Sequence, residues 1–163
     1  MWPIPGTLSS PTRRRLMVLA SALLAAACAS PPKPVITKIE GKVVAAADAN
    51  PDSKGRPSPV IVRIFELKSL AAFSSTDFFS LWNNDSAALG AELAAREELP
   101  LKPGESVPLA RTIQPGVTHF GAIVAYRDLE RAVWRAAIPV PVGQTTKATI
   151  TVGPRTLTIA PAP

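Results

Sequence analysis

The side chains best suited to acid–base catalysis are the single histidine, His119, and the adjacent carboxylates Glu97 and Glu98. A serine hydrolase would use His119 as its base, but the sequence has no G-x-S-x-G motif to present a nucleophile. Adjacent residues on a strand or helix point apart, so Glu97 and Glu98 are expected to be a solvated pair. A metal site needs several His, Cys or clustered carboxylate ligands, and no such group occurs. We therefore expect no enzyme, no metal, no cofactor and no small-molecule substrate, with a hydrolase built on His119 as the weakest alternative.

Three aromatic residues, Phe78, Phe79 and Trp82, offer a different chemistry, because aromatic rings can stack against a sugar. Phe78, Leu81 and Trp82 lie at positions i, i+3 and i+4, which is the spacing of a helix face that packs on a core. Core packing is therefore the expected role of this cluster. Binding of a ligand or glycan is kept as the alternative function.

Cys28 is the only cysteine, and its position suggests modification rather than a disulfide. It follows the basic cluster Arg13–Arg15 and twelve uncharged, mostly apolar residues, Leu16–Ala27, which is the pattern of a secretory signal peptide. The apolar run is too short for a transmembrane helix, which needs roughly 20 residues. The basic segment also loosely resembles a twin-arginine signal. We expect residues 1–27 to be a signal peptide and Cys28 to be diacylated, because Leu24–Ala27 resembles a bacterial lipobox.

Residues 28–34 contain three prolines and read as a short tether between a lipid anchor and a folded domain. Ala29 follows Cys28, where an aspartate commonly retains lipoproteins at the inner membrane, so the outer membrane is expected. Removal of the three arginines of the signal peptide lowers the formal net charge from +6 to +3. Such a mild and scattered charge gives no support for nucleic-acid binding.

The remainder, residues 35–163, alternates between apolar and polar residues at the spacing of β-strands and turns, which predicts a mainly β protein with a two-sheet β-sandwich. Residues 60–67 are apolar on both faces, so both faces should be covered. The segment of about 70–99 shows helical spacing and no strand pattern, and we expect it to be a helical insertion that covers this strand. Strands are predicted at 35–44, 60–67, 107–113, 119–128, 132–140, 145–152 and 156–160.

Residues 45–59 are rich in Gly, Pro, Asp and Asn, which predicts a loop between the first two strands. Composition alone favours a plain connection over a binding loop.

Three stretches, in order, resemble the TssJ lipoproteins of type VI secretion systems, also called VasD or SciN. The first is Asn50–Pro59 followed by Val62–Leu67; the second is Thr76–Trp82 with Leu89-Gly90; the third is Ala125–Leu129 with Trp134-Arg135. The lipobox and the chain length agree with this family. Two departures are Ala25 in the lipobox and Trp82-Asn83, where an aromatic–acidic pair is common.

The resemblance implies a transthyretin-like β-sandwich with a small helical insertion, on an outer-membrane lipoprotein that faces the periplasm. It implies an anchor that binds the periplasmic C-terminal domain of TssM, in a complex with TssL, and no catalysis. The family's TssM-binding loop falls within 49–58 of this sequence. The partner-binding residues would be Asn50, Pro51, Asp52, Ser53, Lys54, Gly55, Arg56 and Pro57. A periplasmic ligand- or glycan-binding lipoprotein remains the alternative.

Overall fold

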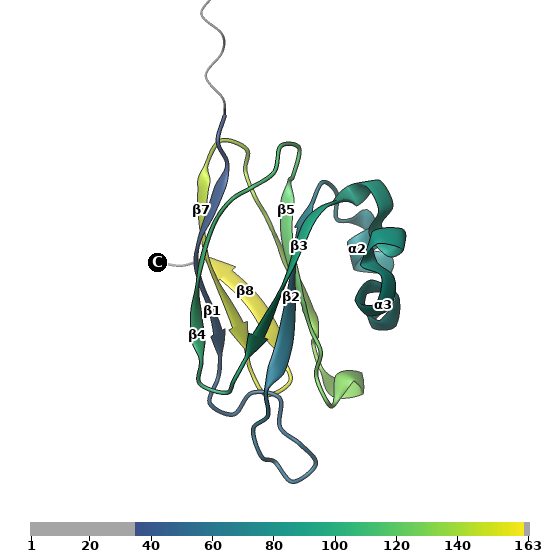
Figure 1. Cartoon of the computed structure of the whole chain (residues 1–163), viewed down its shortest axis with the longest axis vertical. Coiled ribbons are helices and arrows are strands. Elements are labelled where there is room, and N and C mark those ends of the chain that lie inside the picture. The colour runs from purple at the N-terminus through teal and green to yellow at the C-terminus, as the bar shows by residue number, and fades with distance from the viewer. Residues whose placement is uncertain (1–34, 162–163) are drawn as a thin grey trace, which may run out of the picture. The chain divides into compact units, whose positions relative to one another are not determined.

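Two four-stranded sheets, packed face to face, make up most of the computed structural model, which describes residues 35–161 (Figure 1). One sheet has the order β4-β1-β7-β8 and the other β3-β2-β5-β6. Neighbouring strands are antiparallel except β1 and β7, which run parallel. The strands are β1 (Lys38–Ala45), β2 (Val60–Leu67), β3 (Leu93–Leu101), β4 (Ser106–Thr112), β5 (His119–Val124), β6 (Arg135–Pro139), β7 (Thr145–Val152) and β8 (Leu157–Pro161).

The inner faces of the two sheets share one apolar core. Alternate residues of the strands point into it, so Ala148, Ile150 and Val152 of β7 are all buried, while Thr146 at the start of the strand is half-buried. From the facing sheet, Val62 and Ile64 of β2 are fully buried against them. The mainly β sandwich that the alternation predicts is confirmed.

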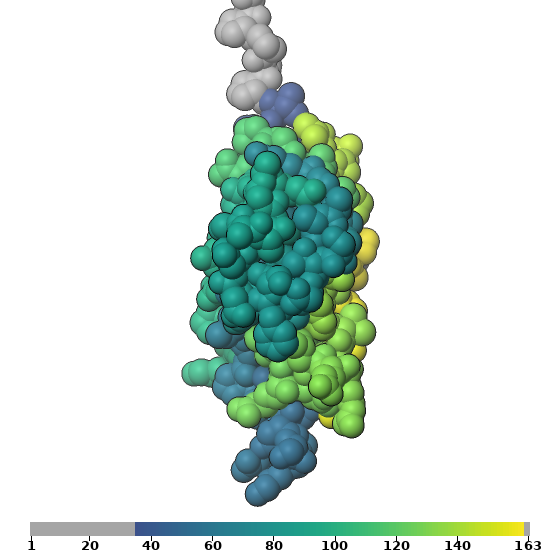
Figure 2. All heavy atoms as spheres, turned by 90° about the vertical axis from the view of Figure 1, so that its right-hand side faces the viewer, coloured from purple at the N-terminus to yellow at the C-terminus, as the bar shows by residue number. Residues whose placement is uncertain are grey.

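The helical insertion lies on the outer face of the β3-β2-β5-β6 sheet (Figures 1 and 2). It consists of α2 (Ala71–Ser75), α3 (Phe78–Leu89) and the 3-10 turn η2 (Gly90–Glu92). Asp77 caps α3: its side chain accepts a hydrogen bond from Ser80 N at 3.0 Å. Asn84 interrupts the helix with non-helical dihedral angles and accepts a bond from Ala87 N at 3.4 Å, so a second helical half begins there.

A second apolar cluster joins the insertion to the sheet, and it explains why β2 is apolar on both faces. Its buried residues are Phe65, Leu67, Phe73, Phe78, Leu81, Leu89 and Ile123. Gly121 of β5 leaves the room for this packing, because a Cβ atom there would lie 2.9 Å from the ring of Phe73. The prediction that an insertion covers the outer face of this strand is confirmed.

The predicted insertion boundary near Leu99 is wrong, because the helical part ends at Glu92 and β3 begins at Leu93. The charged residues Arg96, Glu97 and Glu98 in the middle of β3 hide its strand pattern. Pairing with β2, from Leu93 opposite Leu67 to Leu101 opposite Val60, makes this segment a strand. Strand formation here therefore depends on a partner that is distant in sequence.

The strands predicted at 119–128 and 132–140 form a hairpin, but both are shorter than their pattern suggests. β5 ends at Val124 and β6 begins at Arg135, so the tip includes the 3-10 turn η3 (Leu129–Arg131). Within residues 35–161, no helix has the length and apolar character needed to cross a bilayer.

Candidate functional site

The loop between β1 and β2, residues 46–59, projects from one end of the sandwich (Figures 1 and 2). The described chain begins at Val35, at the opposite end (Figure 1). The predicted partner-binding residues 50–57 all lie in this loop. The structure therefore places them together on an end of the molecule that is remote from the start of β1.

Asp52 holds the loop in shape. Its Oδ1 accepts hydrogen bonds from Lys54 N at 2.8 Å and Arg56 N at 3.0 Å, and its Oδ2 accepts from Arg56 Nε at 2.7 Å. Its own N–H donates to Arg56 O at 2.9 Å, and its C=O accepts from Gly55 N at 2.9 Å. Gly55 has a φ of +76°, which favours glycine at this turn. These bonds close a small turn on one carboxylate.

The same contacts set the ionisation of Asp52. The hydrogen bond from the Arg56 side chain, then those from the backbone N–H groups, hold the pKa of the Asp52 carboxyl below its usual value. The carboxylate is therefore charged throughout the neutral range, and its lone pairs are used within the loop. Asp52 therefore serves mainly to hold the shape of the loop rather than to contact a partner.

Asn50 joins the loop to the body of the sandwich. It is buried and has a φ of 49°, a left-handed conformation that asparagine tolerates better than most residues. Its Nδ2 donates to Pro59 O at 2.8 Å, and its Oδ1 accepts from Arg127 N at 2.8 Å. Both ends of the loop and the β5–β6 connection are thereby fixed to one side chain.

The tip of the loop, residues 53–57, faces solvent and carries the basic residues Lys54 and Arg56, and Asp48 is exposed at the base of the loop. Ser53, Lys54, Gly55, Arg56 and Pro57 are exposed, while Pro51 and Asp52 are half-buried. A shallow groove of about 580 Å³ runs from the loop to two neighbouring turns. On the far side of the groove, Arg155 Nε donates to Asp128 Oδ2 at 2.8 Å. The surface offers charged and backbone groups for a protein contact.

The other predicted candidates lie elsewhere. Phe78 is buried and its ring stacks on Trp82 at 5.5 Å, so the expected core role of this pair is confirmed, whereas Phe79 is 63% exposed. His119 Nδ1 lies 2.8 Å from Thr118 Oγ1. Among residues 35–161, no group of three or more His, Cys, Asp or Glu side chains is placed to hold a metal ion. Cys28 lies outside the described residues.

Glu97 and Glu98 do point apart, as predicted, but each is paired rather than simply solvated. Glu97 forms an ion pair with Arg111, and Glu98 with Arg63. Arg111 also contacts the buried Glu66 at 3.5 Å, which links β4 of one sheet to β2 of the other. These pairs connect elements of the fold.

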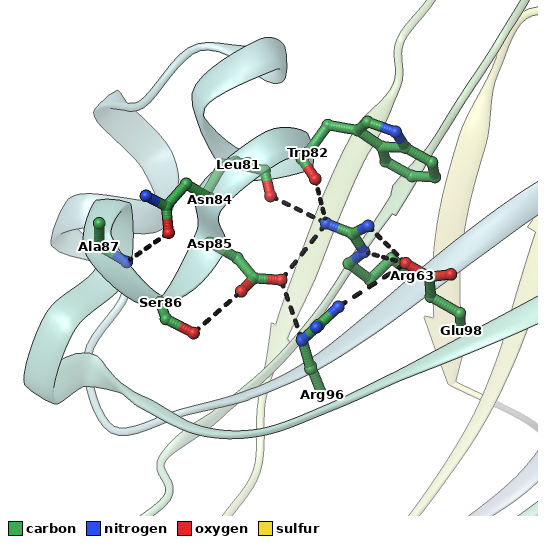
Figure 3. A network of polar contacts seen from close by, with 9 residues as sticks. All are labelled: Arg63, Leu81, Trp82, Asn84, Asp85, Ser86, Ala87, Arg96 and Glu98. Carbon is green, nitrogen blue, oxygen red and sulfur yellow. Dashed lines mark hydrogen bonds and ion pairs between the residues drawn. The ribbon is translucent and has the colours of Figure 1, made fainter.

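Sequence reasoning missed the buried charge network around Arg63, shown in Figure 3. Arg63 NH1 donates to Leu81 O at 3.1 Å and Trp82 O at 2.7 Å, and lies 3.3 Å from Asp85 Oδ2. It therefore binds the carbonyls that α3 leaves free before its break at Asn84. An arginine in a strand whose other residues, except Glu66, are apolar was the signal that could have found this network.

The family model of type VI secretion lipoproteins (T6SS-SciN; VasD, EvfM, TssJ) matches residues 37–155. The chain belongs to the TssJ family. It is a type VI secretion lipoprotein. No curated protein matches it at the level of sequence.

Solved TssJ structures share the architecture. TssJ1 from Pseudomonas aeruginosa is 35% identical, with a TM-score of 0.77 over 78% of this chain and 98% of that one. Serratia marcescens Lip, a membrane-bound component of the type VI secretion system, is 25% identical, with a TM-score of 0.70 over 79% and 98%. A chain from a structure described as a type VI membrane complex has the same fold, with 24% identity, a TM-score of 0.67 and coverage of 77% and 99%.

Proposed function

We propose that this TssJ protein anchors the type VI secretion membrane complex to the outer membrane by binding the periplasmic domain of TssM. Acyl chains on Cys28 would hold the domain at the periplasmic face, and residues 50–57 would contact TssM, which is itself joined to TssL. Diacylation of Cys28 would be enough to hold the protein at the membrane, because two acyl chains give stable attachment whereas one gives only marginal binding.

The observation that carries this proposal is the internal bracing of the loop. The Asp52 carboxylate and the buried Asn50 side chain fix its shape without any partner. Pro51, Pro57 and Pro59 restrict it further. A loop that only connects two strands gains nothing from being ordered so far from the core. A binding loop gains affinity, because its ordering cost is removed before association.

The position of the loop also fits an anchor. Val35, which follows the tether in sequence, lies at one end of the sandwich, and the loop lies at the other (Figure 1). An attachment at the first end leaves the second free to meet a protein that reaches across the periplasm.

Within the loop, Lys54 is the residue best placed to contact the partner. Asp52 is committed to bonds within the loop, and Arg56 is paired to it at 2.7 Å. Lys54 is exposed, and of its groups only the backbone N–H bonds to Asp52. Charges at the rim of an interface act mainly on the rate of association and on its salt dependence.

Co-purification of the TssM periplasmic domain with the full-length lipidated protein tests this assignment. A Gly/Ser replacement of residues 51–57 that keeps Asn50 should abolish recovery of TssM without lowering the melting temperature appreciably. Lys54→Glu should slow association and change its salt dependence, whereas the matched reversal Lys147→Glu, on the exposed side of β7, should change neither. Full recovery of TssM by the replaced loop would refute the loop assignment.

The lipid anchor has its own test. Cys28→Ser removes the only thiol that can be acylated, so the protein should appear uncleaved or soluble in the periplasm. Incorporation of labelled palmitate into Cys28→Ser would contradict the assignment of the anchor. TssM binding in solution should survive this substitution, since the loop does not depend on the anchor.

A further inference from the structure

The two ends of the sandwich differ in charge. At the end that carries the partner-binding loop, every connection contains charged residues: Asp48, Asp52, Lys54 and Arg56; Lys102 and Glu105; Arg127, Asp128, Glu130 and Arg131; and Arg155. At the other end, residues 35–37, 113–118 and 140–144 contain none. The β2–α2 connection at this end adds only one charged residue, Lys68. The carboxylate of Glu92 accepts a hydrogen bond from Ala72 N at 2.9 Å. This end therefore presents no free acidic side chain within the described residues.

Apolar side chains are exposed at this uncharged end. Val35 is 70% exposed, Ile36 54% and Val142 63%. They are three of the six large apolar side chains that are exposed within residues 35–161. We call Val35, Ile36 and Val142 the apolar tip.

The apolar tip has a defined structure, because its two segments, residues 35–38 and 142–144, are hydrogen-bonded to each other. Gly143 N donates to Thr37 Oγ1 at 2.9 Å, and Lys38 N donates to Gln144 O at 3.0 Å. A Cβ atom on Gly143 would lie 2.8 Å from Val35 Cγ1, so the valine packs directly over this turn. Thr37 is buried beneath. The exposed side chains are thus held at the end of the sandwich by backbone and side-chain bonds.

We propose that the apolar tip rests in the headgroup region of the membrane that holds the lipid anchor, so that the domain stands on the bilayer with its partner-binding loop pointing away. This inference rests on the proposed acylation of Cys28. Only six residues, 29–34, separate that cysteine from Val35, and the seven Cα-to-Cα steps from Cys28 to Val35 span at most about 25 Å even when fully extended. Lys38 and Lys68 flank the tip and suit anionic lipid headgroups.

The tether makes so small a contact effective. Three aliphatic side chains would bind a bilayer only weakly by themselves, but a short linker turns their contact into an intramolecular event at high effective concentration. A second copy of the chain is a poorer occupant, because a stable protein interface needs roughly 800 Å² on each partner and three side chains do not provide it.

Fluorescence of a single attached dye tests the proposal in the full-length lipidated protein, in vesicles of phosphatidylethanolamine and phosphatidylglycerol. The thiol of an acylated Cys28 is blocked, so Val142→Cys would carry the only free thiol. The matched control is Ser53→Cys, exposed in the loop at the opposite end. An environment-sensitive dye at position 142 should emit at shorter wavelength and lose intensity when the vesicles contain a lipid-borne quencher. At position 53 it should show neither change.

Each other outcome overturns the proposal. Water-like emission at both positions, with one dye per chain, would show that the anchor is intact but the tip stays away from the membrane. A shorter wavelength at position 142 without quenching by lipid would show that protein, such as a second copy, covers the tip. Two dyes on Val142→Cys would show that Cys28 is free, which removes the lipid anchor and this contact with it.

Discussion

Arg63→Met should loosen the helical insertion from the sheet at a large cost in stability. Arg63 is 6% exposed and lies on the outer face of β2, with its guanidinium 4.2 Å above the ring of Trp82. Methionine keeps much of the apolar length of the side chain but removes every donor. The substitution therefore isolates the polar contacts from the packing.

The expected loss follows from what remains buried. Asp85, whose side chain is 6% exposed, would retain only Arg96 at 3.3 Å as an ionic partner. The carbonyls of Leu81 and Trp82 would lose the donor that binds them. Removing one member of a buried ion pair typically costs about 3–5 kcal/mol. Since whole domains are stable by only about 5–15 kcal/mol, this is a large fraction of the total.

Urea unfolding followed by tryptophan fluorescence measures this loss, because Trp82 lies in the insertion and Trp134 packs against it. The matched control is Arg96→Met, whose side chain is 48% exposed and pairs with the same Asp85; it should cost at most about 1 kcal/mol. If Arg63→Met costs no more than Arg96→Met, the buried network does not hold the insertion in place, and the reasoning fails.

Three further outcomes are expected. Gly41→Ala should prevent folding or lower the melting temperature severely, because the added Cβ would lie 1.7 Å from Ala148 O across the parallel β1–β7 pair. A melting temperature near that of the wild type would refute this. The Tyr126 hydroxyl is buried without a hydrogen-bond partner in the described chain. Tyr126→Phe should therefore leave the free energy of unfolding unchanged or raise it by up to about 1 kcal/mol. A clear loss of stability would reveal a hydrogen bond to that hydroxyl. The Arg56 side chain lowers the pKa of Asp52, so their charged hydrogen bond should stabilise the loop fully at any pH above the ordinary aspartate pKa. This stabilisation should be lost only as the pH falls through the lowered pKa. NMR titration of the Asp52 carboxyl that gives an ordinary pKa would contradict this.

Strand β2, which is covered on both faces, shows how much of the fold the sequence pattern predicts. Two apolar faces on residues 60–67 predict that a second layer exists, because an apolar face left in water is costly. The bounds of β2 and β7 follow directly from the same pattern. The pattern fails at β3, where Arg96, Glu97 and Glu98 read as surface residues, because their partners come from other strands and from α3.

The loop illustrates the same limit for function. Its turn residues predict a loop, and the family resemblance predicts that it binds TssM, but neither distinguishes the contact residues from those that hold its shape. That distinction needs the positions of Asp52, Lys54 and Arg56 in space. The bonds to Asp52 give it the shaping role and leave Lys54 the most available.

By itself the sequence determines the lone cysteine, the mainly β alternation and the family, and it predicts an export signal, since each depends on local residue types or on motifs along the chain. Only the tertiary structure decides that Arg63 binds the carbonyls of α3 and that Asn50 ties its loop to Arg127, seventy-seven residues away. It also decides that the apolar tip and the loop lie at opposite ends. The physical reason is that these contacts join segments far apart in sequence, and their energy depends on burial and geometry that no local pattern records.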